Sequence, residues 1–551
     1  MSIRTIRNVL ANDPEVGAGN VLTSRIALGV GLDDPLLTFD TAVDGHAAWQ
    51  PFTLRELDRA VRARAAALHA LGIGRRDPVV VYATAAADHV LSFLALTRLG
   101  AIPALLNPKV EGERAARYIA RLGAVGILTD PEHRAELAGY DPGAPVLADA
   151  AGLGSGDPDA APAPYRHSAQ DPVAITHSSG TTGMPKAVVH SHASLYAAIR
   201  HRATLPRPQG GDRMLSALPA PHAATVIAVN FSLSTHGELA LLSHQSGDGV
   251  LDAIESWQPR GVIGFAATWA DLAHHDLAAR QLDTVALWWN TGDCAHEAHI
   301  RRLIAAGSRE TVTRQGRGRE PGSVFVDGLG STEMGHSHFF ITHAPGTEKY
   351  GRCVGRPHTF VDCEVVGPDG EPLGPGEVGE LATASPTLAP GYWNDSVTTY
   401  RTRLRGRFLT GDLMYRDEEG FYYHVDRLVD SVDLGNGHRL YTAMSEERVL
   451  ATVPGVLDCT VVAVKDGGQV VTDVLLTLED GADPAADRTE EVVAALDEHT
   501  AATVRSVLVV GGADIPLGPT GKVRKVLLRE RYLASVAGSP AAAVTSSAAA
   551  R

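Results

Sequence analysis

Cysteine is scarce in this chain of 551 residues. The four cysteines lie far apart, and no two of them form a Cys-x-x-Cys pair. This spacing argues against a structural zinc site and against a disulfide framework, and it is typical of the reducing cytoplasm. We therefore expect a cytoplasmic protein, with cysteines at Cys294, Cys353, Cys363 and Cys459.

Long apolar runs are also lacking. The longest stretch without a charged residue runs from Met214 to Gly237, but prolines, histidines and an asparagine interrupt it. It is therefore not expected to span a membrane. The N-terminal segment MSIRTIRNVLANDPE has no apolar core of the kind found in secretory signal peptides. Both features predict a protein that works without a membrane.

Positive charge is in deficit. The chain has 49 Lys and Arg against 64 Asp and Glu, which gives a formal net charge of -15. Such a chain is a poor electrostatic partner for nucleic acid or for an anionic membrane. An anionic substrate must therefore be bound by locally placed cations and backbone amides.

What is present is an alternation of helical and strand patterns. Apolar residues recur at helical spacing over 54–68 and again over 90–94, and short apolar runs at 79–82 and 125–128 indicate buried strands. Strands separated by helices favour right-handed βαβ units and a parallel sheet. With 44% hydrophobic residues, the chain is long enough for two or more domains.

A second alternating block follows residues 149–170, whose Ala, Gly, Pro and Asp content predicts a linker. Residues 307–323 are expected to form a polar loop with four arginines, either a solvated insertion or a cover for an active site. The stretch 352–424 reads as β-rich hairpins. Strands of the second block are expected at Val173–Thr176, Met214–Leu218, Leu239–Leu242, Gly261–Phe265 and Val324–Val326.

A string of small and hydroxylated residues directly follows one of these strands and ends in Pro-Lys. Its glycines free the backbone to curl around a phosphate, and its hydroxyls and lysine add donors and charge. The alternative is a solvent-exposed loop of turn-forming residues, and the spacing is not that of a Walker loop. The predicted phosphate-binding residues are Ser178, Ser179, Gly180, Thr181, Thr182, Gly183 and Lys186.

This string resembles the phosphate loop of the adenylate-forming superfamily, which includes acyl-CoA synthetases, adenylation domains of peptide synthetases and luciferases. Further motifs follow in the order of that family, so the resemblance covers the chain from about residue 50 to 530. It implies an α/β protein with a large N-terminal domain (1–426) of two doubly wound α/β subdomains and a β-rich subdomain. A small mobile C-terminal α/β lid (427–534) and a disordered tail (535–551) complete the expected organisation.

Several motifs carry the nucleotide-binding roles that the resemblance implies. The segment Gly330-Ser331-Thr332-Glu333 is similar to the family motif in which the Thr contacts the α-phosphate and the Glu holds Mg²⁺. Read alone, the same residues would be a helix N-cap. The other implied nucleotide contacts are the ribose-binding Asp412 of Thr-Gly-Asp, the nucleotide-binding Arg427, and Gly292 beside the adenine and the substrate.

The resemblance also implies a mobile catalytic loop. Lys522, in Pro-Thr-Gly-Lys, is expected to bridge the attacking oxygen and the α-phosphate, and Asp430 to be the hinge of the lid. His222 matches a gate beside the substrate carboxylate, although a histidine that caps the next helix is an equal alternative. His336 and His338 could line the acid pocket.

The chain departs from the family pattern at two places. Leu329 stands where the family has an aromatic ring that stacks on adenine. Asp426 replaces a glycine, Asp433 replaces a lysine, and Gly437 comes one residue late. The segment 426–437 matches the loop that helps form the pantetheine tunnel of CoA ligases, so these changes weaken the expectation of thioester formation.

The sequence therefore predicts an ATP- and Mg²⁺-dependent ligase that joins AMP to a small acid, releases pyrophosphate and passes the activated group to a nucleophile. The default acid is a carboxylate and the default acceptor is CoA. The alternative is a diazotase of secondary metabolism, which activates nitrite as nitrosyl-AMP for transfer to an arylamine such as an aminoaryl acid. A regulator that has lost catalysis is disfavoured, because Lys522, Glu333, Asp412 and Arg427 are all retained.

Overall fold

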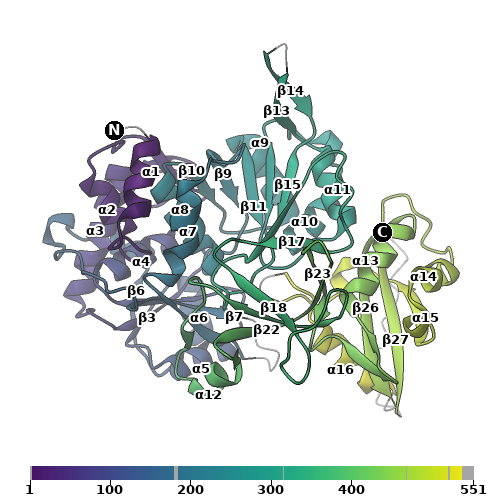
Figure 1. The fold of residues 1–551 in the computed structure, drawn as a ribbon. Coiled ribbons are helices and arrows are strands. Elements are labelled where there is room, and N and C mark those ends of the chain that lie inside the picture. The colour runs from purple at the N-terminus through teal and green to yellow at the C-terminus, as the bar shows by residue number, and fades with distance from the viewer. Residues whose placement is uncertain (1–2, 179–183, 314–315, 467, 519–520, 537–551) are drawn as a thin grey trace, which may run out of the picture. The chain divides into compact units, whose positions relative to one another are not determined.

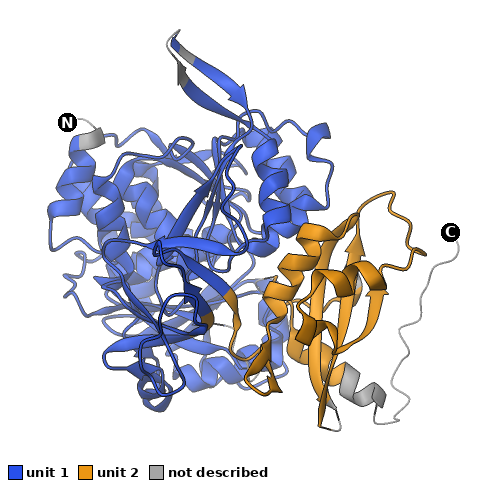
Figure 2. Cartoon of the chain, turned by 45° about the vertical axis from the view of Figure 1, so that its right-hand side comes forward, with its two compact units in different colours: residues 1–410, 414–424 blue, residues 411–413, 425–551 orange. Residues whose placement is uncertain are grey.

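The computed structural model describes residues 3–178, 184–313, 316–466, 468–518 and 521–536. The chain divides into two compact units, which Figure 2 distinguishes by colour. Unit 1 comprises residues 1–410 and 414–424, and unit 2 comprises residues 411–413 and 425–551. The domain boundaries 1–426, 427–534 and 535–551 remain predictions, and residues 537–551 of the expected tail lie outside the described part.

One sheet of unit 1 runs in the order β20-β8-β7-β4-β3-β5-β6 (Figure 1). Its strands β3 to β7 pair in parallel, whereas β8 and β20 add antiparallel strands at one edge. The strands are β3 (Pro78–Tyr82), β4 (Ile102–Leu106), β5 (Gly126–Thr129), β6 (Val146–Asp149), β7 (Pro172–Ser178), β8 (Lys186–Ser191) and β20 (Gly391–Tyr392).

Both faces of this sheet are covered. Val79 and Val81 pack in a cluster that contains residues of helices α3 and α4, whereas Val80 and Tyr82 pack in a cluster with residues of α5. Successive side chains of a strand point to opposite faces, so the continuous apolar run predicted at 79–82 fits a strand buried on both sides.

The other large sheet of unit 1 runs in the order β18-β19-β22-β23-β17-β16-β15-β12-β11-β9-β10-β1-β2, with β21 paired to β22. The stretch from β15 to β1 is parallel, and the part from β15 to β18 contains antiparallel pairs, as the hairpin pattern of 352–424 predicts. Its strands are β1 (Pro35–Phe39), β2 (Pro51–Thr53), β9 (Arg213–Ser216), β10 (Glu238–Leu241), β11 (Gly261–Gly264), β12 (Leu287–Asn290), β15 (Val324–Asp327), β16 (Phe339–His343), β17 (Cys353–Pro357), β18 (Asp362–Val366), β19 (Gly379–Ala384), β21 (Arg403–Leu404), β22 (Arg407–Arg416) and β23 (Tyr422–Arg427).

Helices of unit 1 bury these sheets. A cluster around Trp269 and Trp288 fills the space between the parallel strands and α9 to α11. None of the described helices is both long enough and apolar enough to cross a membrane. The helices are α1 (Ile3–Asn12), α2 (Val21–Ala27), α3 (Leu54–Ala70), α4 (Ala86–Arg98), α5 (Gly112–Leu122), α6 (Pro131–Leu137), α7 (Ser194–Thr204), α8 (Ala223–Thr235), α9 (Gly247–Trp257), α10 (Ala266–Ala273), α11 (Glu297–Ala305), α12 (Ser396–Arg401) and the 3-10 turn η3 (Leu277–Ala279).

Two expectations of loop structure are wrong. The segment 307–323 is a hairpin of β13 (Ser308–Thr313) and β14 (Gly316–Pro321), which projects from the rest of unit 1 (Figure 1). The supposed linker 149–170 contains the 3-10 turns η1 (Ala151–Ser155) and η2 (Pro158–Ala160), which pack on α3. It links β6 to β7 within one sheet and therefore does not separate two domains.

Unit 2 is a small α/β unit in which β26-β27-β28 form a sheet and β24-β25 form a hairpin. Its helix α13 packs on β26, and α16 also contacts that strand. The elements are β24 (Val432–Gly435), β25 (His438–Leu440), α13 (Thr442–Thr452), β26 (Val456–Asp466), β27 (Gln469–Leu478), α14 (Thr489–Ala495), α15 (Glu498–Ala501), β28 (Val504–Val509), η4 (Gly512–Asp514) and α16 (Lys525–Val536).

Candidate active site

The predicted site residues of unit 1 follow the carboxyl ends of neighbouring parallel strands. β9, β11, β12 and β15 are adjacent and parallel, so their carboxyl ends meet at one edge of the sheet. This edge is the usual ligand site of open α/β sheets. The segments that follow these strands carry His222, Phe265, Gly292 and Gly330.

Two glycines let these segments approach each other closely. Gly292 has φ +92°, a backbone conformation that residues with a Cβ rarely adopt, and its carbonyl accepts a hydrogen bond of 2.8 Å from the Gly330 amide. A Cβ on Gly330 would lie 2.7 Å from the carbonyl oxygen of His336. Only glycine fits this position without moving the segment that follows Glu333.

His222 both caps a helix and faces the Thr-Glu motif. Its Nδ1 accepts a hydrogen bond of 3.1 Å from the Ala224 amide at the start of α8. That bond places the ring proton on Nε2, which lies 3.4 Å from Oγ1 of the buried Thr332. The cap interpretation is therefore correct, and the ring also faces the Thr-Glu motif, whereas the role of a gate beside the substrate stays a prediction. In this tautomer Nε2 is a donor and cannot accept a proton.

The Glu333 carboxylate links the Thr-Glu motif to the start of the phosphate loop. Its Oε1 accepts hydrogen bonds of 2.7 Å from the Ser178 hydroxyl and 3.1 Å from the Tyr392 hydroxyl. Burial, followed by the charge of Glu333, raises the pKa of Tyr392, so this phenol stays a neutral donor. Three segments far apart in the sequence thus place one carboxylate beside the loop.

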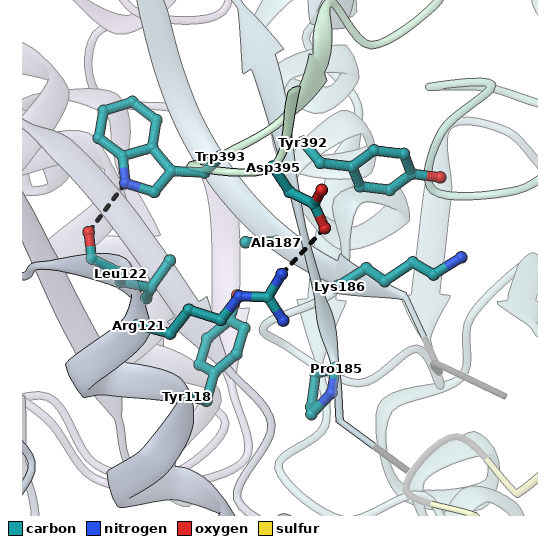
Figure 3. A pocket seen from close by; sticks show the side chains of 9 residues that line it. All are labelled: Tyr118, Arg121, Leu122, Pro185, Lys186, Ala187, Tyr392, Trp393 and Asp395. Carbon is teal, nitrogen blue, oxygen red and sulfur yellow. Dashed lines mark hydrogen bonds and ion pairs between the residues drawn. The ribbon is translucent and has the colours of Figure 1, made fainter. Parts of the chain in front are cut away.

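Lys186 begins β8 and pairs in register with Ser178 at the end of β7. Its Nζ lies 5.6 Å from the centroid of the Tyr392 ring. Figure 3 shows these two side chains alongside each other, at a small pocket that Arg121 and Asp395 also line. Within the described residues no carboxylate forms an ion pair with Lys186, so its charge is available to an incoming anion.

Part of the predicted loop cannot be compared with the structure. Ser179, Gly180, Thr181, Thr182 and Gly183 lie outside the described residues. Ser331 uses its Oγ to accept a hydrogen bond of 3.2 Å from the Met334 amide, but these residues form a turn and no helix begins here, so the alternative of a helix N-cap is wrong.

Unit 2 brings together two of the predicted nucleotide contacts. Nε of Arg427 lies 2.9 Å from Oδ1 of Asp412, which is buried, whereas the arginine is more exposed. The backbone of Gly411, at φ +76°, lets Arg427 come close to Asp412. The Gly411 carbonyl accepts a hydrogen bond of 2.8 Å from the Leu428 amide. The carboxylate is thus held in a fixed orientation within β22, beside the last residue of β23.

Asp430 and Lys522 also belong to unit 2. The Asp430 carbonyl accepts a hydrogen bond of 2.9 Å from Arg529 of α16, whose guanidinium also lies 3.4 Å from the Asp430 carboxylate. The Lys522 carbonyl accepts a hydrogen bond of 2.7 Å from the Gly518 amide. The Pro519 and Thr520 of its motif lie outside the described residues.

The unusual Asp426 has a structural role. Its carboxylate accepts hydrogen bonds from the amide and hydroxyl of Thr442, the first residue of α13. The same hydroxyl accepts a bond of 2.7 Å from Lys525, which also pairs with Glu446. Burial lowers the pKa of Lys525, but the carboxylates of Glu446, Asp426 and Asp430 raise it by more. The departure from glycine thus creates a buried charged network.

The two histidines after the Thr-Glu motif differ in role. His338 is buried, and its ring nitrogens contact the hydroxyls of Thr383 (2.8 Å) and Thr387 (2.9 Å). It therefore ties the residue before β16 to β19 and to the segment that follows β19. His336 is only partly buried and lies beside the aromatic residues considered further below.

Sequence reasoning missed some residues of this site. Tyr392 carries no spacing signal, because its partner Glu333 is 59 residues away. Phe265 packs edge-on against His222, with ring centroids 4.8 Å apart, and also meets Gly292. The apolar character of 261–265 predicted the strand correctly. It could not show that the aromatic side chain just after the strand lies at the site. Leu329, by contrast, is a buried core residue.

Comparison with known proteins identifies the family. The model of the family described as AMP-binding enzyme matches residues 34–393. The chain belongs to this family. It is an ATP-dependent adenylate-forming ligase, so the suspected membership of the adenylate-forming superfamily is confirmed.

Individual relatives differ in chemistry. A 3-aminoavenalumate diazotase from Streptomyces sp is 42% identical over 557 residues, covering 96% of this chain and 98% of the relative. A feruloyl-CoA synthase from Amycolatopsis sp is 27% identical, covering 87% of this chain and 94% of the relative.

Solved structures confirm the fold. An anthranilate CoA ligase in complex with anthranoyl-AMP matches with a TM-score of 0.80 at 20% identity, covering 96% of this chain and 99% of that one. ATP-bound MatB from Rhodopseudomonas palustris matches with a TM-score of 0.75 at 23% identity, covering 94% and 99%. The predicted α/β fold, with a large N-terminal and a small C-terminal domain, is therefore correct.

Proposed function

We propose that this AMP-binding enzyme is an ATP-dependent diazotase that activates nitrite and transfers the nitrosyl group to an aminoaryl acid. The observation that carries the proposal is the 42% identity, over nearly the whole length of both chains, to a protein named 3-aminoavenalumate diazotase. The CoA synthases and CoA ligases among the relatives share 27% to 29%. The sequence alone favoured a carboxylic acid and CoA, and the comparisons support its alternative better.

The first step is formation of nitrosyl-AMP. A nitrite oxygen attacks the α-phosphorus of ATP, a new O–P bond forms, and the bond to pyrophosphate breaks, with its electron pair leaving on pyrophosphate. Lys186 supplies a cation beside the phosphate loop, and Thr332 a hydroxyl that donates to the α-phosphate. On the family resemblance, Lys522 bridges the incoming oxygen and the α-phosphate, and Asp412 and Arg427 bind the nucleotide.

Glu333 fits a Mg²⁺ ligand. Its Oε1 takes both described hydrogen bonds, and within the described residues no donor is recorded for Oε2. No group of three or more His, Cys, Asp or Glu side chains suited to a metal occurs among those residues. A single carboxylate, completed by substrate phosphates and water, is the usual way in which proteins hold Mg²⁺. When bound, the ion neutralises charge on the phosphates.

The second step is transfer to the amine. The arylamine nitrogen attacks the nitrosyl nitrogen, the N–O bond breaks, and AMP leaves with the oxygen that came from nitrite. The amine loses a proton, and the N-nitrosoarylamine tautomerises, takes up a proton and loses water to give the diazonium ion. His222 already carries its proton on Nε2, so we assign it the positioning of Thr332 rather than proton abstraction.

Thioester formation is the second candidate, because the family includes CoA synthases. Against it stands the segment 426–437, where Asp426 belongs to a buried charged network with Thr442 and Lys525. In the family this segment helps form the pantetheine tunnel. CoA is therefore the less favoured acceptor, and an amine the favoured one.

AMP release with purified protein separates the candidates. The reaction contains ATP and Mg²⁺ with nitrite and an aminoaryl acid, and parallel reactions replace nitrite with CoA. We expect AMP release that requires nitrite, is unaffected by CoA, and is lost in Lys522→Ala. AMP release and thioester formation with CoA in the absence of nitrite would instead support the ligase of carboxylic acids.

A further inference from the structure

Arg202 is a charged side chain that has no counterion among the described residues. It lies in the last turn of α7, and its Nε is buried without a hydrogen-bond partner. Within the described residues no carboxylate pairs with it. Burial lowers the pKa of Arg202 to about 10, so the guanidinium stays charged at neutral pH. A desolvated charge without a counterion is costly, and proteins usually pair one with an anion.

The surroundings of Arg202 are flat and aromatic. Its guanidinium carbon lies 4.3 Å from the centroid of the Trp289 ring. His358 stacks on Phe360, with centroids 5.1 Å apart and planes at 7°, and His336 lies 5.8 Å from His358. Burial, followed by the charge of Arg202, lowers the pKa of both histidines, to about 3 for His358. At neutral pH these rings are uncharged, and Arg202 is the cation among them.

This cluster remains accessible and adjoins the candidate active site. Arg202, Trp289, His336 and Phe360 are each only partly buried. Trp289 is the third residue of β12, and Thr291 just beyond the strand has its hydroxyl 2.9 Å from that of Ser337. The carbonyl of His336 packs against Gly330. The cluster therefore adjoins the segment that directly follows the Thr-Glu motif.

We propose that Arg202 binds the carboxylate of the aminoaryl acid, with the aromatic ring held among Trp289, His336 and Phe360. The inference rests on the proposed function and names the substrate contact that selects an acid. The planar guanidinium presents paired donors that match the two oxygens of a carboxylate. The neutral rings supply flat contact surface for the aryl group.

The chemistry of diazotisation explains why such an anchor is needed. When nitrite is the activated anion, the carboxylate of the amine substrate does not react and requires a separate partner. When a carboxylate is itself activated, it must lie at the α-phosphate beside Thr332, and Arg202 would then require a second anion. An unpaired arginine next to the reaction site therefore fits an acid whose reacting group is its amine.

Binding calorimetry with the AMP-saturated protein tests the inference without nitrite. The ligands are 3-aminocinnamate and its neutral amide, 3-aminocinnamamide, which share ring and amine and differ in charge. We expect the wild type to bind the acid about 10- to 100-fold more tightly than the amide, the range for a charged hydrogen bond. Arg202→Gln should bind both alike, and Arg202→Lys should recover part of the preference.

Two controls define the outcomes. Arg117→Gln removes an exposed arginine of α5 that pairs with Glu113, and it should retain the wild-type preference. The Tm of Arg202→Gln should not fall, because the variant removes a desolvated, unpaired charge. The inference is overturned if the wild type does not distinguish the ligands or if Arg202→Gln still prefers the acid. Arg202-dependent binding without nitrite-dependent turnover would reject the diazotase and leave the carboxylate contact standing.

Discussion

At the scale of single residues, the site depends on contacts between positions far apart in the sequence. The family motifs assign Ser178, Glu333 and Lys186 to one nucleotide site, but only the fold shows that Glu333 accepts a hydrogen bond from Ser178, 155 residues away. Tyr392 and Arg202 could not be predicted. Neither residue belongs to a recognisable sequence motif, and the role of each depends on the residues that the fold places beside it.

Glu333→Gln tests the carboxylate beside the phosphate loop. The amide keeps the size of the side chain but removes its charge. We expect kcat/KM for adenylation to fall by about 100-fold or more, and the Mg²⁺ concentration at half-maximal activity to rise. Steady-state assays over a Mg²⁺ series measure both.

Tyr392→Phe is the matched control for this variant. It removes one hydrogen bond to Glu333 and retains the carboxylate, so the loss should stay within about 10-fold, the range for one neutral hydrogen bond. Equal losses in the two variants, with an unchanged Mg²⁺ requirement, would contradict the assignment of Glu333.

Asp426→Asn tests the buried network of unit 2. The substitution leaves Lys525 with less compensating charge and makes the hydrogen bonds from Thr442 neutral, and the loss of a hydrogen bond to a charged group costs about 1.5–3 kcal/mol. We expect a lower urea midpoint for the transition of unit 2. Far-ultraviolet circular dichroism, a signal that does not depend on tryptophan, measures this midpoint. Asp433→Asn, at an exposed position of β24, should leave the midpoint unchanged. Equal midpoints in both variants would show that Asp426 is not structural.

At the scale of elements, the spacing of apolar residues predicted the strands well, because buried parallel strands are short and continuously apolar. The pattern failed where polar residues form strands. Arg309 and Glu320 face each other across β13 and β14, and their side chains pair at 3.1 Å. Cross-strand pairing of opposite charges stabilises a hairpin that composition alone describes as a loop.

Shortening this hairpin tests whether it takes part in the reaction. Replacement of residues 309–320 by Asn-Gly joins the paired Ser308 and Pro321 through a two-residue turn. Because the hairpin projects from unit 1 (Figure 1), we expect the rate of AMP release to change by less than about two-fold. A loss of ten-fold or more would assign it a role in the active site.

At the scale of the whole molecule, buried histidines make stability depend on pH. Burial lowers the pKa of several histidines of unit 1 to about 4, and these are His89, His177, His190, His192 and His343. A histidine whose folded pKa is lowered stabilises the fold above its unfolded pKa of about 6.5 and loses this contribution as pH falls. Asp88 and Asp327, whose pKa values burial raises to about 6, act in the opposite direction but are fewer.

We therefore expect the Tm of the protein to fall as the pH is lowered from 6.5 to 5. Differential scanning fluorimetry across this range measures it, with ionic strength held constant. His190→Gln, which retains a side-chain acceptor for the Thr176 hydroxyl, should flatten the slope. A Tm that is constant or that rises on acidification would contradict the assignment of these histidines as buried and neutral.

Isotope transfer tests the central claim most directly, that this AMP-binding enzyme joins nitrite to AMP. The protein is incubated with ATP, Mg²⁺, an aminoaryl acid and nitrite labelled with ¹⁵N and ¹⁸O, and AMP and the diazo product are analysed by mass spectrometry. The account predicts one ¹⁸O atom in AMP and ¹⁵N in the terminal nitrogen of the product, because the N–O bond breaks after the O–P bond has formed. Unlabelled AMP would contradict it.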